Sequence, residues 1–160
     1  VGQIGTIELK GENIFKGYWG MEEKTKESFK DDGFFITGDL AKKDENGYFT
    51  IVGRDKDMII SGGLNVYPKE IEDVINELPN ITESAVFGVQ HDDFGEAVVA
   101  AVVATDDKND GSQILDYVKD KIAKYKQPKK IIFMSNLPRN SMGKVQKNKL
   151  RENNKSLFKS

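Results

Sequence analysis

Three short segments hold residues whose types and spacing could carry chemistry, and the first spans residues 34–40, FFITGDL. An aromatic run typical of a strand is followed by Thr37, Gly38 and Asp39. A carboxylate at the end of a strand can accept two hydrogen bonds from a ribose diol. The Gly-Asp pair is also typical of a plain turn, so this segment alone leaves both interpretations open.

The second segment, residues 53–72, has the sequence GRDKDMIISGGLNVYPKEIE. The guanidinium group of Arg54 could bridge ribose or phosphate oxygens, because its donors form a rigid planar fork. Gly62 and Gly63 would allow a ligand to approach the backbone closely. A hairpin with a salt-bridged edge would also explain the residues, but the length of the segment and the order of its parts favour a binding role.

The third segment, residues 137–150, has the sequence LPRNSMGKVQKNKL. Its Gly-Lys pair invites comparison with a P-loop, but Pro138 replaces the first glycine and Val145 replaces the required Ser or Thr. A Walker motif is therefore excluded. What remains is Lys144 on a mobile, glycine-hinged loop before a short helix, where it could reach a phosphate as a flexible point charge.

Composition narrows the classes of protein. The 160 residues are 38% hydrophobic and 31% charged, which is typical of a globular protein and leaves room for one domain plus part of another. Without cysteine there can be no disulfide or thiolate nucleophile, so the cytoplasm is the expected compartment. No apolar run approaches the roughly 20 residues of a membrane span. The only histidine, His91, is predicted in an exposed turn, and we expect no metal site.

The order of strand and helix patterns predicts an α+β fold. Residues 1–54 appear as a β-rich remnant of a larger domain, because short apolar runs alternate with turn signals. Residues 55–160 predict a compact domain with a small three-stranded sheet covered by helices. One of these helices would begin at a capping box formed by Asp110 and Gln113. The chain begins with Val1, so we expect it to be a piece of a longer protein.

The expected elements are strands at residues 4–9, 34–36, 48–52, 84–89, 97–104 and 130–134, and helices at residues 22–29, from 68, from 110 and at 145–152.

Charge is distributed unevenly along the chain. From Lys119 to Ser160 there are 13 Lys or Arg residues against only Asp120 and Glu152. Such a cationic third could bind nucleic acid or a polyphosphate, or could serve only solubility.

Taken together and in this order, the three segments resemble the adenylate-forming superfamily, which includes acyl-CoA synthetases. Residues 5–19, GTIELKGENIFKGYW, resemble a fourth element of that family, GELxxxGxxxxxGY. The resemblance implies that a carboxylic acid attacks ATP to give an acyl-AMP and pyrophosphate, and that coenzyme A (CoA) then displaces AMP. Residues 60–72, 125–133 and 137–147 further resemble malonyl-CoA synthetase-like ligases of short- and medium-chain acids.

The resemblance also implies roles for individual residues. Lys144 would be the catalytic lysine of adenylation, Asp39 and Arg54 would bind the nucleotide ribose, and Lys56 would be the hinge about which the C-terminal domain rotates. The remaining residues are expected at the CoA site. Gly62 and Gly63 would line the CoA tunnel, and phosphates of CoA could contact Lys126, Lys129 and Lys130.

The acyl pocket, the phosphate loop and the glutamate that positions Mg²⁺ would lie in an N-terminal domain upstream of Val1, so this chain alone is expected to be inactive. One departure from the family is Phe35, where many members have Tyr or Trp. Three alternatives stay open. They are an adenylation domain that loads a carrier protein, a basic nucleic-acid-binding module, and a stand-alone regulatory domain.

Overall fold

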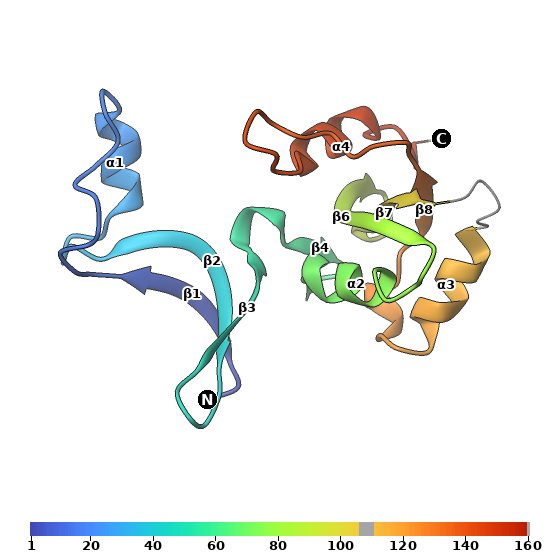
Figure 1. The fold of residues 1–160 in the computed structure, drawn as a ribbon, viewed down its shortest axis with the longest axis horizontal. Coiled ribbons are helices and arrows are strands. Elements are labelled where there is room, and N and C mark those ends of the chain that lie inside the picture. The colour runs from blue at the N-terminus through green and yellow to red at the C-terminus, as the bar shows by residue number, and fades with distance from the viewer. Residues whose placement is uncertain (106–110, 160) are drawn as a thin grey trace. The chain divides into compact units, whose positions relative to one another are not determined.

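The computed structural model describes residues 1–105 and 111–159 (Figure 1). The chain divides into two compact units, Val1–Lys56 and Asp57–Ser160. The expected boundary between residues 54 and 55 lies two residues earlier. That the first unit is the end of a larger domain stays a prediction. The predicted capping box depends on Asp110, which lies outside the described residues.

The first unit is a three-stranded antiparallel sheet with the order β1-β2-β3 and one short helix. The prediction that Asp39 ends its strand was wrong, because pairing with β3 continues through Asp39 to Lys43. Gly38 has φ +73°, and the register shifts after Leu40, so the strand bends but does not stop. The elements are β1 (Ile4–Leu9), α1 (Glu22–Ser28), β2 (Phe35–Lys43) and β3 (Phe49–Arg54).

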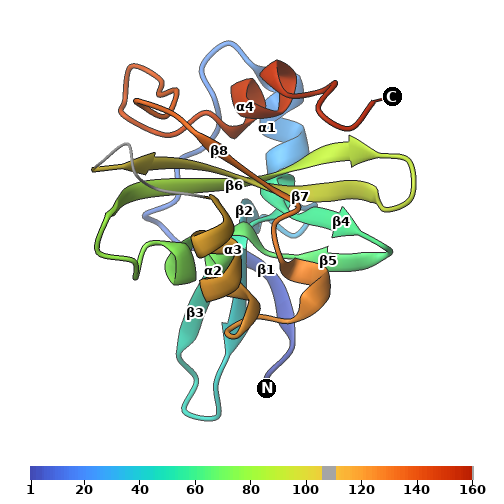
Figure 2. The ribbon, with the colours of Figure 1, turned by 90° about the vertical axis from the view of Figure 1, so that its right-hand side faces the viewer.

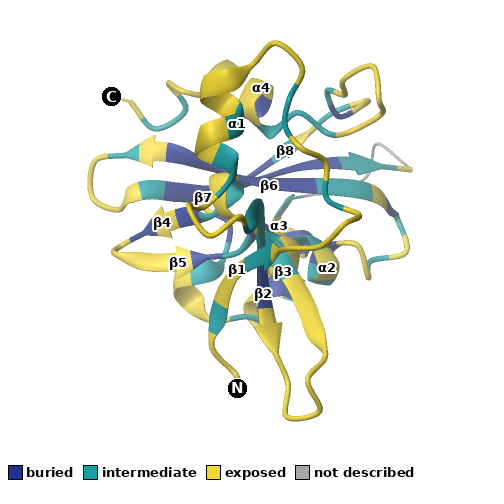
Figure 3. Cartoon of the chain, turned by 90° about the vertical axis from the view of Figure 1, so that its left-hand side faces the viewer, coloured by how far each residue is buried: buried dark blue, intermediate teal, exposed yellow. Residues whose placement is uncertain are grey.

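Little of the first unit is buried (Figure 3). Its buried apolar residues are Leu40 and Ala41, and its aromatic side chains gather around Phe15 with ring centroids 5.0 to 5.7 Å apart. The side chain of Trp19 is 99% exposed. Such a unit has a small core for its size.

The second unit confirms the expected α+β class, but its sheet has five strands rather than three. The difference arises from the hairpin of β4 and β5, which joins the sheet where Ser61 pairs with Gly95. The elements are β4 (Ile59–Ser61), β5 (Leu64–Val66), α2 (Pro68–Ile75), β6 (Ile81–His91), β7 (Gly95–Ala104), α3 (Gly111–Lys119), β8 (Lys130–Phe133) and α4 (Lys147–Asn153), with 3₁₀ turns at Asp55–Asp57 and Lys124–Lys126.

Both faces of this sheet are covered, because alternate residues of β6 and β7 point to opposite sides. Figure 2 shows α2 and α3 on one side and α4 on the other. Ile71, Ile75 and Val118, all fully buried, pack with Val86 and Val98 on the first side. The residues on the second side are Ala85, Phe87, Val89, Val99, Ala101, Leu137 and Leu150. The nearly continuous apolar run of β7 follows from burial on both faces.

The environment of His91 differs from the prediction. It is the last residue of β6 rather than part of an exposed turn, and it is half-buried. Its ring lies 4.7 Å from the ring of Phe94 and 5.2 Å from that of Phe158. Its Nδ1 accepts a hydrogen bond from the backbone N–H of Asp93 at 3.1 Å.

Candidate functional site

In the first unit the structure brings together the two residues expected to bind a ribose. Asp39 and Arg54 are cross-strand partners on β2 and β3, and Arg54 Nε lies 2.8 Å from Asp39 Oδ1. The hydroxyl of Thr37 accepts the backbone N–H of Asp39 at 3.0 Å and donates to the carbonyl of Ile7 at 2.8 Å. The carboxylate is therefore oriented both by its strand partner and by the bend before it.

Lys56 lies in the 3₁₀ turn Asp55–Asp57, directly after β3. The boundary between the two units falls immediately after this residue. A residue at such a boundary can change its backbone angles without disturbing either core, which is what a hinge requires. The rotation itself stays a prediction.

Gly62 and Gly63 form the two-residue turn between β4 and β5. Their φ angles of +57° and +77° match a type I′ turn, in which both central residues need positive φ. The N–H of Gly62 donates to the carbonyl of Phe94 at 2.9 Å, which fixes the turn against the β6–β7 connection. A Cβ added at either glycine would meet no atom within 4 Å, so the turn leaves open space around its backbone.

Lys144 is presented by a compact turn whose backbone is held mainly by Asn140. The side-chain oxygen of Asn140 accepts the N–H groups of Met142 at 3.0 Å and Lys144 at 2.9 Å. The backbone N–H of Asn140 donates to the carbonyl of Lys144 at 3.0 Å, and Gly143, with φ +77°, closes the turn. Lys144 itself is exposed, and no described residue forms an ion pair with it.

Arg139, which lies at the start of the same turn, also holds it in place. Its Nη1 donates to the carbonyl of Gly143 at 2.6 Å, and its Nη2 pairs with the carboxylate of Glu83. The turn is thus tied to β6 as well as to itself. The sequence predicts a mobile, glycine-hinged loop, and the structure shows a hydrogen-bonded turn on which the side chain of Lys144 is exposed.

The three lysines expected at the CoA phosphates differ in their surroundings. Lys126 is ion-paired with Glu70 at 2.7 Å. Burial lowers the pKa of Lys126, but the hydrogen bond and charge of Glu70 outweigh this, so the pKa is raised above 10.5. Lys129 lies 5.0 Å from the ring centroid of Phe94, and Lys130 is exposed at the start of β8. Lys129 and Lys130 are therefore more available to a ligand than Lys126.

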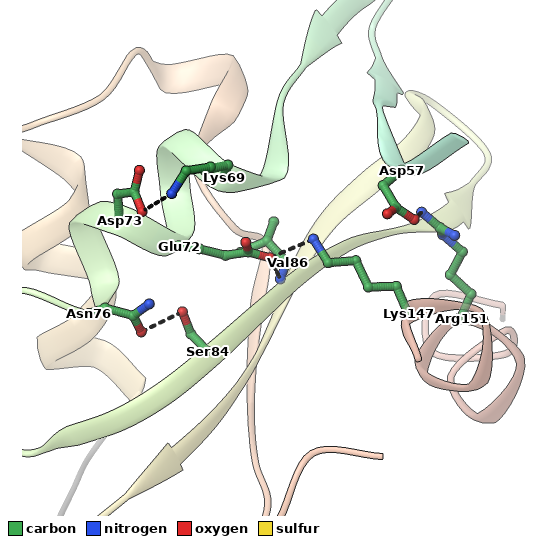
Figure 4. Close-up of polar contacts among 9 residues, drawn as sticks. All are labelled: Asp57, Lys69, Glu72, Asp73, Asn76, Ser84, Val86, Lys147 and Arg151. Atoms are coloured by element: carbon green, nitrogen blue, oxygen red, sulfur yellow. Dashed lines mark hydrogen bonds and ion pairs between the residues drawn. The ribbon is translucent and has the colours of Figure 1, made fainter. Parts of the chain in front are cut away.

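Sequence reasoning missed a set of charged residues that connects α4 to the rest of its unit (Figure 4). Lys147 pairs with Glu72, and Arg151 pairs with Asp57. The sequence did contain a signal for this set. Lys147 and Arg151 are four residues apart on a short helix, and residues with this spacing share one helix face.

Two kinds of feature are absent from the described part of the chain. No group of three His, Asp or Glu side chains in residues 1–105 and 111–159 is arranged to hold a metal ion. In the same residues no helix is both long and apolar enough to cross a membrane.

Comparison with known proteins gives the family context. Residues 70–144 match the model of the AMP-binding enzyme C-terminal domain. Over 92% of this chain, 45% of residues are identical to long-chain-fatty-acid–CoA ligase FadD13 of Mycobacterium tuberculosis, of which the chain covers 29%. Malonate–CoA ligase of Arabidopsis thaliana is 39% identical over 93% of the chain, which covers 26% of that protein.

A solved structure is similar over nearly the whole chain. It is ATP-bound MatB from Rhodopseudomonas palustris, with 58% identity, a TM-score of 0.91, and coverage of 99% of this chain and 32% of that one. The chain thus spans about 30% of the length of the relatives it matches. Residues 70–144 thus belong to the AMP-binding enzyme C-terminal domain family, and nearly the whole chain is similar to part of these larger AMP-binding ligases.

Proposed function

We propose that this chain is the C-terminal part of an ATP-dependent acyl-CoA synthetase, an acid–thiol ligase that forms an acyl-AMP and transfers the acyl group to CoA. The observation that carries the proposal is the presentation of Lys144. Its amine is exposed and unpaired among the described residues, on a turn whose backbone is fixed by Asn140 and Arg139. A cation held in this way can meet charge that develops on a phosphate.

The first half-reaction joins the acid to the nucleotide. A carboxylate oxygen attacks the α-phosphorus of ATP, a new O–P bond forms, and the bond to pyrophosphate breaks. Negative charge on the phosphoryl oxygens is stabilised by a preorganised cation, and loss of one such contact typically costs ~2.7 to 4 kcal/mol. We assign this role to Lys144.

The nucleotide itself is proposed to bind through the ribose. A carboxylate accepts from the two hydroxyls while a guanidinium donates to ribose oxygens, and Asp39 and Arg54 already lie side by side at 2.8 Å. Lys56, which immediately precedes the unit boundary, is the proposed pivot between the two half-reactions.

In the second half-reaction the sulfur of CoA attacks the acyl carbon, and the C–O bond to AMP breaks. We propose that the pantetheine arm passes the turn of Gly62 and Gly63, where no atom lies within 4 Å of an added Cβ. Lys129 and Lys130 are the proposed phosphate contacts. Lys126 would have to leave Glu70 to contribute.

Mg²⁺ is expected with ATP in this family, but the described residues do not fit a magnesium site, because no group of three suitable side chains is present. We propose that the metal is held by the part of the enzyme outside this chain. The chain alone is then inactive. The enzyme is proposed to act in the cytoplasm, as expected for a chain without cysteine.

The acid substrate is proposed to be malonate or another short- or medium-chain acid. The support is limited to similarity with a malonate–CoA ligase, because a long-chain ligase matches the same residues as well. Both relatives share this domain while acting on different acids. The choice of acid therefore depends on residues outside the chain.

The test uses the full-length enzyme that contains this chain. ATP–pyrophosphate exchange is measured with a panel of carboxylic acids that includes malonate, and thioester formation is then measured with CoA or with an acidic carrier protein. Exchange with at least one acid and thioester with CoA are expected. Thioester only with the carrier protein would favour the adenylation-domain alternative, and no exchange with any acid would refute the proposal.

A further inference from the structure

Helix α4 follows the Lys144 turn after only two residues, so its position decides where the lysine points. One side of the helix is fixed by Leu150, which is fully buried against the face of the sheet that also contains Phe87. Leu150 is the only buried residue within the helix, and Val145, Leu157 and Phe158, which lie before and after it, pack only partly buried against the same cluster. These apolar contacts hold the helix on the sheet but do not fix how it is turned about its axis. Other contacts must therefore fix its orientation.

The first such contact joins three elements at one oxygen atom (Figure 4). Glu72 Oε1, on α2, accepts Lys147 Nζ at 2.6 Å and the backbone N–H of Val86, on β6, at 2.7 Å. The side chains of Lys147 and Glu72 are 16% and 18% exposed. The start of α4 is thus joined to both α2 and β6 in a largely water-excluded position.

The second contact lies one helical turn later. Arg151 Nη2 is 3.3 Å from Asp57 Oδ1, and the two side chains are 29% and 21% exposed. Asp57 is the residue immediately after Lys56, and it opens the second unit. The same face of α4 that pairs with α2 therefore also pairs with the first residue beyond the proposed hinge.

Ion pairs of this kind contribute more to geometry than to net stability. Desolvation of the two charges offsets much of their attraction, whereas removal of one partner leaves a poorly solvated charge. An exposed pair on the same helix α2, Lys69 with Asp73, is 53% and 59% exposed and should contribute little. That pair provides a matched control.

We propose that Glu72, Lys147, Asp57 and Arg151 are positioning residues that lock α4, so that the Lys144 turn moves as one rigid body with the segment after Lys56. The proposal rests on the proposed function of Lys144 and Lys56. A rotation about the hinge would otherwise be lost in bending between the hinge and the lysine. Each pair has one residue on α4, Lys147 or Arg151. The helix therefore follows the residues with which they pair, Glu72 and Asp57.

The main variant is the double substitution Glu72→Gln with Lys147→Met in the full-length enzyme. Gln keeps an acceptor for the N–H of Val86, and Met keeps most of the lysine stem, so the fold should persist. The control is Lys69→Met with Asp73→Asn. We expect ATP–pyrophosphate exchange to fall about 10- to 100-fold in the main variant, since a misplacement of about 1 Å can cost about 10²-fold.

Three comparisons separate positioning from a general structural role. Thioester formation from supplied acyl-adenylate should stay near the control value. The single variant Lys147→Arg, which keeps a cation opposite Glu72, should retain most of the exchange activity. In a Lys144→Ala background the double substitution should cause no further loss, because residues that act through one another are not additive. Equal losses in both half-reactions, or a full additional loss without Lys144, would overturn the proposal.

A readout without catalysis keeps the inference separate from the proposed function. Amide hydrogen exchange of residues 138–153 should increase in the main variant while β6 and β7 stay protected. If the wild-type enzyme shows no exchange of pyrophosphate with any acid, the proposed function fails, and amide exchange alone decides whether α4 is locked. Unchanged amide exchange would refute the lock. Should the main variant fail to fold, Arg151→Met at the more exposed pair gives the same comparison.

Discussion

Removal of the Lys144 amine tests the link between the turn and adenylation most directly. The side chain is exposed and has no ion-pair partner among the described residues, so Lys144→Ala should change the free energy of unfolding by no more than about 0.5 kcal/mol. The transition state should lose about 2.7 to 4 kcal/mol of stabilisation. At about 1.4 kcal/mol per factor of ten, this is a loss of roughly 10²- to 10³-fold in rate.

The assay compares the two half-reactions of the full-length enzyme. ATP–pyrophosphate exchange should show the whole loss, and thioester formation from supplied acyl-adenylate should be almost unchanged. Lys149→Ala, which removes an exposed lysine from the adjacent helix, is the control and should leave both rates intact. Equal losses in both half-reactions, or a lowered unfolding temperature that accounts for the loss, would contradict the assignment of Lys144.

Three further substitutions test other parts of the structure. Asp39→Asn should raise the KM for ATP with little effect on stability, because its ion pair is partly exposed; an unchanged KM would argue against ribose binding. Gly63→Asn, which tolerates positive φ, should slow thioester formation more than adenylation, whereas Gly47→Asn in another hairpin turn should slow neither. The hydrogen bond from Lys121 lowers the pKa of Glu77 below 4.5, so this carboxylate stabilises the fold above that pH and loses the effect as pH falls through the lowered value. Thermal unfolding of Glu77→Gln should therefore depend less on pH below about 4.5, and an unaltered pH dependence would contradict this.

The fold could be predicted from sequence where periodicity was strong. The strand at residues 4–9 and the helix that begins at Pro68 lie where the patterns placed them. The β4–β5 hairpin was missed as part of the sheet, because its three-residue strands are too short to show a period and its one bridge to β7 is a tertiary contact. Asp39 was placed at a strand end because Gly38 is a turn signal, whereas pairing with β3 overrides it.

The site could be predicted only as separate motifs. Sequence motifs pointed to Asp39 and Arg54 individually, but their direct pairing depends on the register of β2 with β3, which includes an irregularity that no local pattern reveals. The Lys144 turn was expected to be loose, because a glycine signals freedom of the backbone. The side-chain oxygen of Asn140 removes that freedom by accepting two N–H groups.

The cationic C-terminal third has a different meaning in the folded chain than in the sequence. Four of its 13 Lys and Arg residues pair with one acidic stretch, residues 70–83, and two more, Arg151 and Lys155, pair with Asp57 and Glu152. The four pairs are Glu70–Lys126, Glu72–Lys147, Glu77–Lys121 and Glu83–Arg139. Nearly half of these cations are therefore matched by carboxylates of the same chain, which leaves a weaker basic surface than the sequence alone suggests. A nucleic acid would need a continuous row of free cations. The cations of this third that remain without an ion pair in the described residues are Lys119, Lys124, Lys129, Lys130, Lys144, Lys149 and Lys159. Among them, Lys129 and Lys130 are adjacent and Lys144 lies on a turn, so these three can contact separate small phosphate groups without forming such a row.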